Sequence, residues 1–200
     1  MTEIKHRLAK YGKDLTHVAK FLIDYKDIFS LSYLYKLMHE WLVEEGYALR
    51  EDSEFQEVFY LQRDTPHGLE YWIRWRMLKR PYKTSLWCYA LDIDVHAYMM
   101  KKAELILAGK KYEVDKGEIE IEVQGNLIVD PDRKLEKSLL RNFKPLIFKG
   151  LLRKRFEDHR KTFYNEVYRF QDAIKTYLKL ETYLPEKELS EYWMKKPGAS

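Results

Sequence analysis

The sequence predicts one α+β domain in which an antiparallel sheet packs against helices. Apolar residues recur at helical spacing towards both ends of the chain, whereas in the middle they alternate with polar residues. Short turn sequences separate the alternating stretches, which is typical of strands joined by tight connections. The chain has 200 residues and no Gly- or Ser-rich linker. We therefore expect a single domain over residues 1–184 and a short C-terminal tail over residues 185–200.

The N-terminal part of the chain predicts a strand followed by two helices. Residues 2–9 alternate loosely, as in a short strand. Asp14 stands where a helix N-cap belongs, and the apolar residues of segment 15–22 follow at helical spacing. A clearer apolar stripe covers residues 34–42, and Gly46 lies where a glycine commonly ends a helix.

The central part of the chain predicts an antiparallel meander. The alternating segments are residues 55–63, 69–79, 86–98, 103–107 and 118–129. Turn residues such as Pro66, Gly68 and Pro81 separate them. Such short connections favour a sheet of about five or six strands, with one face packed and the other in contact with water.

Helical spacing returns after residue 130. Apolar residues between 135 and 147 form one face of a predicted helix, which Pro145 should kink or break. A longer helix is predicted over residues 156–177, and Pro185 ends this pattern. The sheet is therefore followed by a long C-terminal helical region.

This order of elements resembles the helix-grip superfamily, which includes START domains and polyketide-cyclase-like proteins. The matching parts are the predicted helices around 18–22 and 34–42, the strands between 55 and 129, and the helix beginning near Arg133. The resemblance covers about residues 2–165 and rests on the order of elements. It implies a curved sheet that grips the C-terminal helix, with an apolar ligand between the two.

A non-enzymatic binding protein is the leading functional hypothesis, and no cofactor is expected. Its apolar small molecule would contact residues that face inward from the sheet and the C-terminal helix. These candidates are Tyr71, Ile73, Trp75, Trp87, Tyr89, Phe143 and Ile147. The same residues are also what an ordinary packed core requires.

A metal-dependent enzyme is one alternative. Asp92, Asp94 and His96 alternate along one predicted strand and so share a face, and the three glutamates of segment 118–122 do the same. If the two strands are neighbours, carboxylates and an imidazole converge, as in sites for divalent cations. A solvated face, on which the carboxylates pair with nearby lysines, is the favoured interpretation of this pattern.

A nucleic-acid or ribosome-associated factor is the other alternative. Segment 133–161 has eleven basic and three acidic residues, a charge of +8, whereas the whole chain carries +4. RNA phosphates or an anionic membrane surface would be attracted to it. The first residues to test are Arg141, Lys149, Arg153, Lys154 and Arg155. A solvated helix face is the favoured alternative.

Several classes of protein are disfavoured. The single cysteine, Cys88, allows no intramolecular disulfide and is predicted to be a buried thiol. The sequence contains no P-loop, dinucleotide-binding or nucleophile-elbow motif. His39 and Glu40 begin a zinc-protease motif, but Val43 replaces its second histidine. We see no secretory leader or membrane-spanning stretch and expect a cytoplasmic protein, with a composition similar to that of thermophile proteins.

Overall fold

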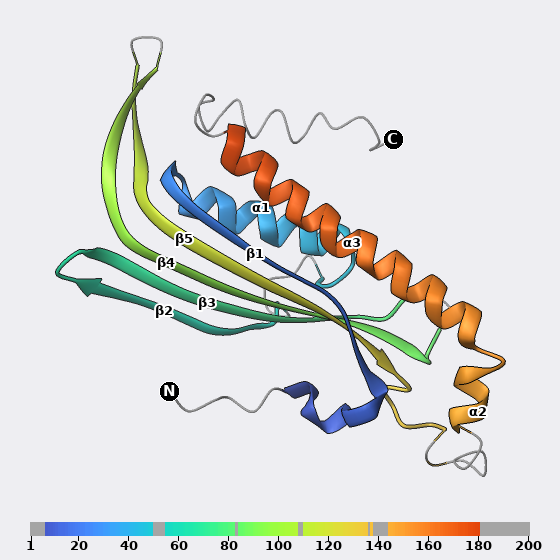
Figure 1. Cartoon of the computed structure of the whole chain (residues 1–200). Helices are drawn as coiled ribbons and strands as arrows, with labels where there is room; N and C mark the ends of the chain where they lie inside the picture. Colours follow the sequence, from blue (N-terminus) through green and yellow to red (C-terminus); the bar gives the residue numbers. More distant parts are fainter. Residues whose placement is uncertain are drawn as a thin grey trace.

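Five antiparallel strands form one sheet in the order β1-β5-β4-β3-β2 (Figure 1). The structure is a computed structural model that describes residues 7–49, 55–82, 84–107, 110–135, 137 and 144–180. The strands are β1 (Leu15–Phe29), β2 (Glu57–Thr65), β3 (Gly68–Lys79), β4 (Trp87–Leu107) and β5 (Lys110–Val129). The α+β class and the antiparallel meander predicted from the sequence are confirmed.

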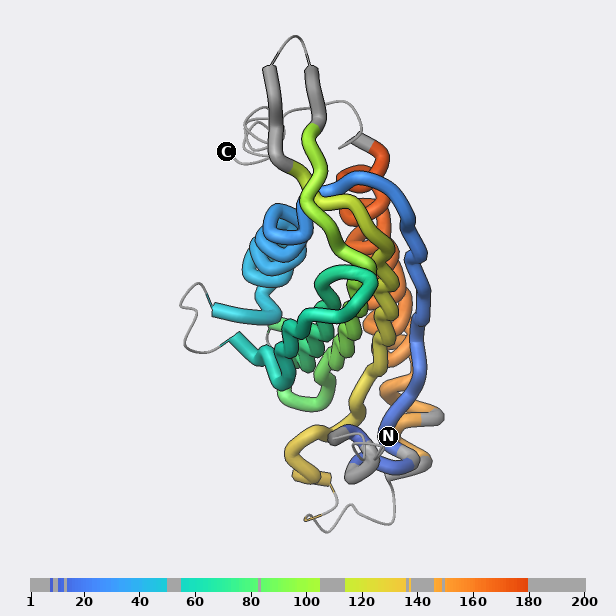
Figure 2. Tube along the Cα trace, turned by 90° about the vertical axis from the view of Figure 1, so that its left-hand side faces the viewer, coloured from blue at the N-terminus to red at the C-terminus, as the bar shows by residue number. Residues whose placement is uncertain are grey.

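The principal helices cover one face of this sheet, which we call the helix face. The helical elements are the 3-10 helix η1 (Arg7–Asp14) and the α-helices α1 (Leu31–Glu44), α2 (Lys144–Lys149) and α3 (Arg153–Leu180). Figures 1 and 2 show the long helix α3 running along the sheet. Buried side chains of α1, α3 and four strands form one hydrophobic core. The opposite sheet face, which we call the open face, is largely polar.

The segment predicted as the first helix is the edge strand β1, so that prediction is wrong. Ala19, Phe21 and Ile23 are buried on the helix face, with exposed residues between them. This alternation is the signature of a half-buried strand. Leu22 is an exposed leucine on the open face and gave the segment its false helical spacing.

β4 is one continuous strand where the sequence predicted two. A bulge around Met99, whose φ is +55°, shifts its pairing with β5 between Tyr98 and Lys101. Gly68 allows the bulge, because a Cβ there would lie 2.7 Å from the carbonyl oxygen of Met100. Beyond the bulge, β4 and β5 continue as a hairpin past the end of β3.

The C-terminal helices agree in part with expectation. The long helix is confirmed as α3. Pro145 is the second residue of α2 (Lys144–Lys149), and the predicted kink or break at this proline stays a prediction. Segment 138–143 and the predicted tail lie outside the described residues. Near the N-terminus, residues 7–14 form η1, not the predicted strand, and residues 2–6 are not described.

A small second core lies on the open face under η1. Leu8 of η1 packs there against Cys88, Ala90 and Ile128. The cysteine is buried, as predicted. η1 therefore covers one end of the open face and leaves the rest of it to polar side chains.

Candidate functional site

The open face brings together the carboxylates and the histidine singled out in the sequence. β4 and β5 are neighbours, and their register places His96 opposite Glu120 and Asp94 opposite Glu122. On the other side of β4, Asp92 lies opposite Arg76 of β3. The two strands are thus neighbours, which is the condition that the sequence analysis set for these polar side chains to converge.

Cations from the flanking strands neutralise much of this cluster. Arg76 Nη2 donates to Asp94 Oδ1 at 2.7 Å, and its Nε lies 3.8 Å from the buried Asp92. From β1, Lys20 lies 2.7 Å from Glu122. Each contact joins a carboxylate to a base on another strand, as a solvated but cross-linked sheet face requires.

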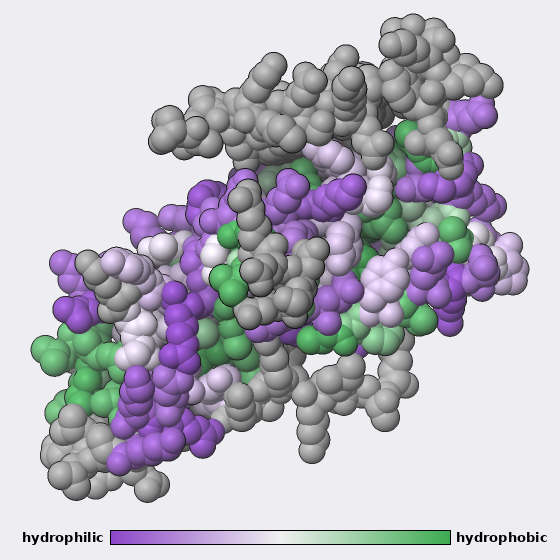
Figure 3. Space-filling view, turned by 180° about the vertical axis from the view of Figure 1, so that it is seen from behind, coloured by the Kyte–Doolittle hydropathy of each residue, from purple (hydrophilic) through white to green (hydrophobic). Residues whose placement is uncertain are grey.

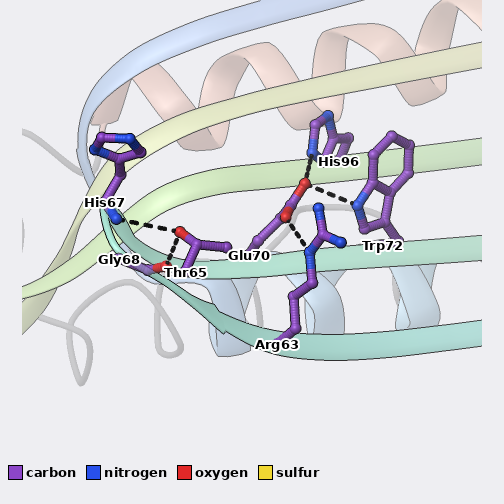
Figure 4. A network of polar contacts seen from close by, with 7 residues as sticks. All are labelled: Arg63, Thr65, His67, Gly68, Glu70, Trp72 and His96. Atoms are coloured by element: carbon purple, nitrogen blue, oxygen red, sulfur yellow. Dashed lines mark hydrogen bonds and ion pairs between the residues drawn. The ribbon is translucent and has the colours of Figure 1, made fainter.

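His96 points towards Glu70 of β3 (Figure 4). Glu70 Oε1 accepts a hydrogen bond from Trp72 Nε1 at 2.9 Å and lies 2.8 Å from His96 Nε2. Its other oxygen accepts from Arg63 Nε at 2.5 Å. The indole of Trp72 stacks on the imidazole of His96, with 3.7 Å between ring centroids. We call these four residues the Glu70 network.

The Glu70 network weakens the metal-site hypothesis, although it does not test it. Nowhere in the described ranges do three or more His, Cys, Asp or Glu residues gather so as to hold a metal ion. The imidazole of His96 is engaged with a carboxylate on the opposite side from Asp94. The metal-dependent enzyme therefore stays a prediction, and metal analysis of the purified protein is its direct check.

We predict that the carboxylate of Glu70 stabilises the fold and that this stabilisation is lost in acid. The hydrogen bond from Arg63, followed by that from His96, lowers the pKa of Glu70 to about 2. A carboxyl group with a lower pKa in the folded than in the unfolded protein stabilises the fold at pH values above its unfolded-state pKa. This stabilisation is lost as the pH falls towards the folded-state pKa. Between about pH 4.5 and pH 2 we expect the urea midpoint of the wild type to fall faster than that of Glu70→Gln.

Glu122→Gln is the matched control on the same face. Its partner Lys20 and Glu122 itself are both about half exposed, so their ion pair contributes little. At pH 7 the Glu70→Gln variant should be less stable than the Glu122→Gln variant. The difference in stability between Glu70→Gln and the wild type should shrink as the pH falls. A constant difference down to pH 2 would contradict the role given to Glu70.

The inward candidates for an apolar site lie in a packed layer. Ile73, Trp75, Trp87 and Tyr89 are all buried on the helix face. Tyr89 stacks on Phe163 of α3 at 4.6 Å, and its hydroxyl lies 2.9 Å from His159 Nδ1. Tyr71 and Ile147 are half-buried. Phe143 lies outside the described residues.

A cavity of about 580 Å³ lies between α1 and the start of β2. Its lining residues are Tyr35, Lys36, His39, Glu40, Phe55 and Glu57. The rings of His39 and Phe55 pack together at 4.3 Å, and Phe55 meets Trp75 edge-on at 4.9 Å. We call this the α1–β2 cavity.

Glu57 is the polar centre of the α1–β2 cavity. Its Oε2 accepts hydrogen bonds from the Tyr35 hydroxyl and from Trp75 Nε1, each at 2.9 Å. A register shift between Glu57 and Phe59 pairs Glu57 with Trp75 and Phe59 with Arg74. Sequence reasoning missed this residue, because β-bulges leave no clear signal in a single strand.

A second cavity, of about 450 Å³, lies beside the β4 bulge. Its lining residues are Lys26, Asp27, His67, Met99, Lys101, Lys116, Gly117 and Glu118. Lys26 is ion-paired with Glu118 there, and this contact lowers the pKa of Glu118. The lining therefore carries both positive and negative side chains, and the ion pair between Lys26 and Glu118 neutralises two of them.

The basic candidates lie partly at the start of α3. Arg153, Lys154 and Arg155 are exposed in its first turn. Arg141 lies outside the described residues, as does the side chain of Lys149 in α2. The basic segment is thus not one continuous helix face, because α2 and α3 are separate helices with a turn between them.

Comparison with known proteins assigns no family to the chain. No protein-family model matches it, and no curated protein matches it. No helix in the described ranges is long and apolar enough to cross a membrane. Function must therefore be inferred from the geometry of the two sheet faces and the helices.

Proposed function

We propose that the protein is a non-enzymatic binding protein that holds a small molecule in the α1–β2 cavity. The observation that carries the proposal is this cavity of about 580 Å³ with Glu57 positioned in its wall. Small-molecule sites commonly have volumes of roughly 300–1,000 Å³ and contain a few oriented polar groups. The hydrogen bonds from Tyr35 and Trp75 preorganise that carboxylate.

The proposal moves the ligand away from the place that the sequence suggested. An apolar molecule between the sheet and α3 would have to separate rings in contact, such as those of Tyr89 and Phe163. Binding in the α1–β2 cavity needs no such separation. A relation to the helix-grip superfamily is part of the proposal, and the packing of the sheet against the long C-terminal helix α3 supports it.

The lining of the α1–β2 cavity favours a flat ring that carries an amine. Tyr35, His39 and Phe55 supply ring surfaces. Among the described lining residues, the carboxylates of Glu40 and Glu57 outnumber the ammonium group of Lys36. In the proposal the ring lies against Phe55, and the ligand amine donates to Glu57 Oε1.

Calorimetric titration with tryptamine, and with indole-3-propionate as its anionic counterpart, tests this proposal. We expect the amine to bind and the acid to bind at least tenfold more weakly. Glu57→Gln keeps an acceptor for Tyr35 and Trp75 but removes the charge. It should weaken tryptamine binding by roughly 10- to 100-fold, since a hydrogen bond to a charged group contributes about 1.5–3 kcal/mol.

Two phenylalanines of the same region give matched controls. Phe55→Ala removes a cavity wall and should weaken the binding of both ring compounds. Phe59→Ala changes a partly exposed ring over Arg74 and should leave both affinities unchanged. Binding that is insensitive to both Glu57→Gln and Phe55→Ala would reject the site.

A further inference from the structure

One end of the molecule gathers three segments that are distant in the sequence. The β3–β4 loop, the chain after β5 and the α2–α3 connection all lie there, at the lower right of Figure 1. Arg80 in that loop makes two hydrogen bonds to Asp132, at 2.6 and 2.9 Å. Trp87 at the start of β4 packs edge-on against Phe148 of α2 at 5.6 Å. These contacts join the β3–β4 loop to the chain after β5, and the start of β4 to α2.

Large apolar side chains protrude into water at this end. Leu146 is 71% exposed and Leu151 is 83% exposed, whereas their neighbours Phe148 and Leu152 pack against the core. Tyr82 in the β3–β4 loop is 86% exposed. Figure 3 shows hydrophobic side chains gathered at the α2 end, at its lower left. Clustered apolar exposure of this kind marks an interaction site more often than a random surface.

A run of exposed basic residues follows the two leucines directly. Arg153, Lys154 and Arg155 are exposed in the first turn of α3. Within the described residues none of the three forms an ion pair, whereas Arg160 further along α3 pairs with Glu157 at 2.7 Å. Three cations therefore lie beside two protruding leucines; we call residues 146–155 the α2–α3 corner.

We propose that the α2–α3 corner docks on the surface of an anionic lipid bilayer. Leu146 and Leu151 enter the boundary between headgroups and acyl chains, and the three basic residues contact lipid phosphates. Tyr82 lies at the same end, and tyrosine is enriched at the level of the headgroups. Apolar insertion and electrostatic attraction together produce stable surface binding where either alone is weak.

The leucines favour a bilayer over RNA as the partner of this basic surface. RNA phosphates bind basic side chains, and exposed bases stack on aromatic rings or guanidinium groups. Neither kind of contact uses two exposed aliphatic side chains, which would stay in water in an RNA complex. A bilayer removes them from water. This inference is independent of the α1–β2 cavity, because the two sites share no residue.

Co-sedimentation of the full chain with vesicles tests the inference. We expect binding to phosphatidylcholine vesicles that contain 25% phosphatidylglycerol and at least tenfold weaker binding to pure phosphatidylcholine. The double variant Leu146→Ser, Leu151→Ser should bind the anionic vesicles about 100-fold more weakly, at roughly tenfold for each leucine removed from water. Changing Arg153, Lys154 and Arg155 to Gln should also weaken binding about 100-fold.

Leu22→Ser is the matched control, because Leu22 is an exposed leucine on the open face. It should bind anionic vesicles as the wild type does, and thermal unfolding of every variant checks that the fold is intact. Three results would overturn the proposal. They are equal binding by the double-serine variant, absence of binding to anionic vesicles, and preferential binding of a poly(U) RNA that the serine substitutions leave unchanged.

Discussion

Replacing Trp75 by alanine is expected to lower the free energy of unfolding by about 3–5 kcal/mol. The side chain is fully buried and joins two parts of the molecule. Its ring meets Tyr35 and Phe55 edge-on, each at 4.9 Å, and its Nε1 donates to Glu57. The substitution leaves a cavity in the core and removes a donor from that carboxylate. Urea denaturation followed by circular dichroism measures the loss.

Two further tryptophan variants separate the causes of this loss. Trp75→Phe keeps most of the packing but removes the N–H, and we expect it to cost about 1–3 kcal/mol, the penalty of weakening a hydrogen bond to a partly buried charge. Trp72→Ala on the open face removes a half-buried ring and should cost less than Trp75→Ala. A cost for Trp75→Ala below 1 kcal/mol would contradict its place in the core. The α1–β2 cavity should also lose its affinity for tryptamine in that variant.

Gly68→Ala is expected to cost about 2–5 kcal/mol, from backbone strain and from overpacking together. Gly68 has a φ of +135°, a backbone conformation that residues other than glycine rarely adopt. An added Cβ would lie 2.7 Å from the carbonyl oxygen of Met100 and 3.0 Å from the carbonyl carbon of Met99. These backbone atoms belong to the β4 bulge and have little room to move. Denaturant unfolding again measures the effect.

Gly46→Ala isolates the backbone part of that cost. Gly46 also has a positive φ, +78°, but a Cβ there meets no atom within 4 Å. We expect it to cost only about 1 kcal/mol, as for a non-glycine residue in a left-handed conformation. If the two alanine variants proved equally stable, close contact with Met100 would not explain the glycine at position 68.

The alternating strands show what local sequence predicts well. In β3, Ile73, Trp75 and Met77 alternate with Arg74 and Arg76 along the sequence, and the three apolar residues are the buried ones. Adjacent side chains on a strand must point to opposite faces, so one buried residue determines its neighbours. The long α3 was equally predictable, because its apolar residues recur over many helical turns.

β1 shows where the same reasoning fails. Val18, Ala19 and Leu22 have helical spacing, but Phe21, Ile23 and Tyr25 alternate as in a strand. Pairing with β5 along the whole length of β1 decides between the two patterns. No local signal reveals that partner, which lies about a hundred residues further along the chain.

Local periodicity thus determined the α+β class, the meander and the division of side chains between the sheet faces. Tertiary structure decided which of those side chains meet. Pairing of β3 with β4 brings His96 to Glu70, and the β2 bulge brings Glu57 beside Trp75. It also decided that Leu146 and Leu151 remain in water although they are as apolar as any core residue. Periodicity depends on neighbours along one segment, whereas contact and exposure depend on segments that only the folded chain brings together.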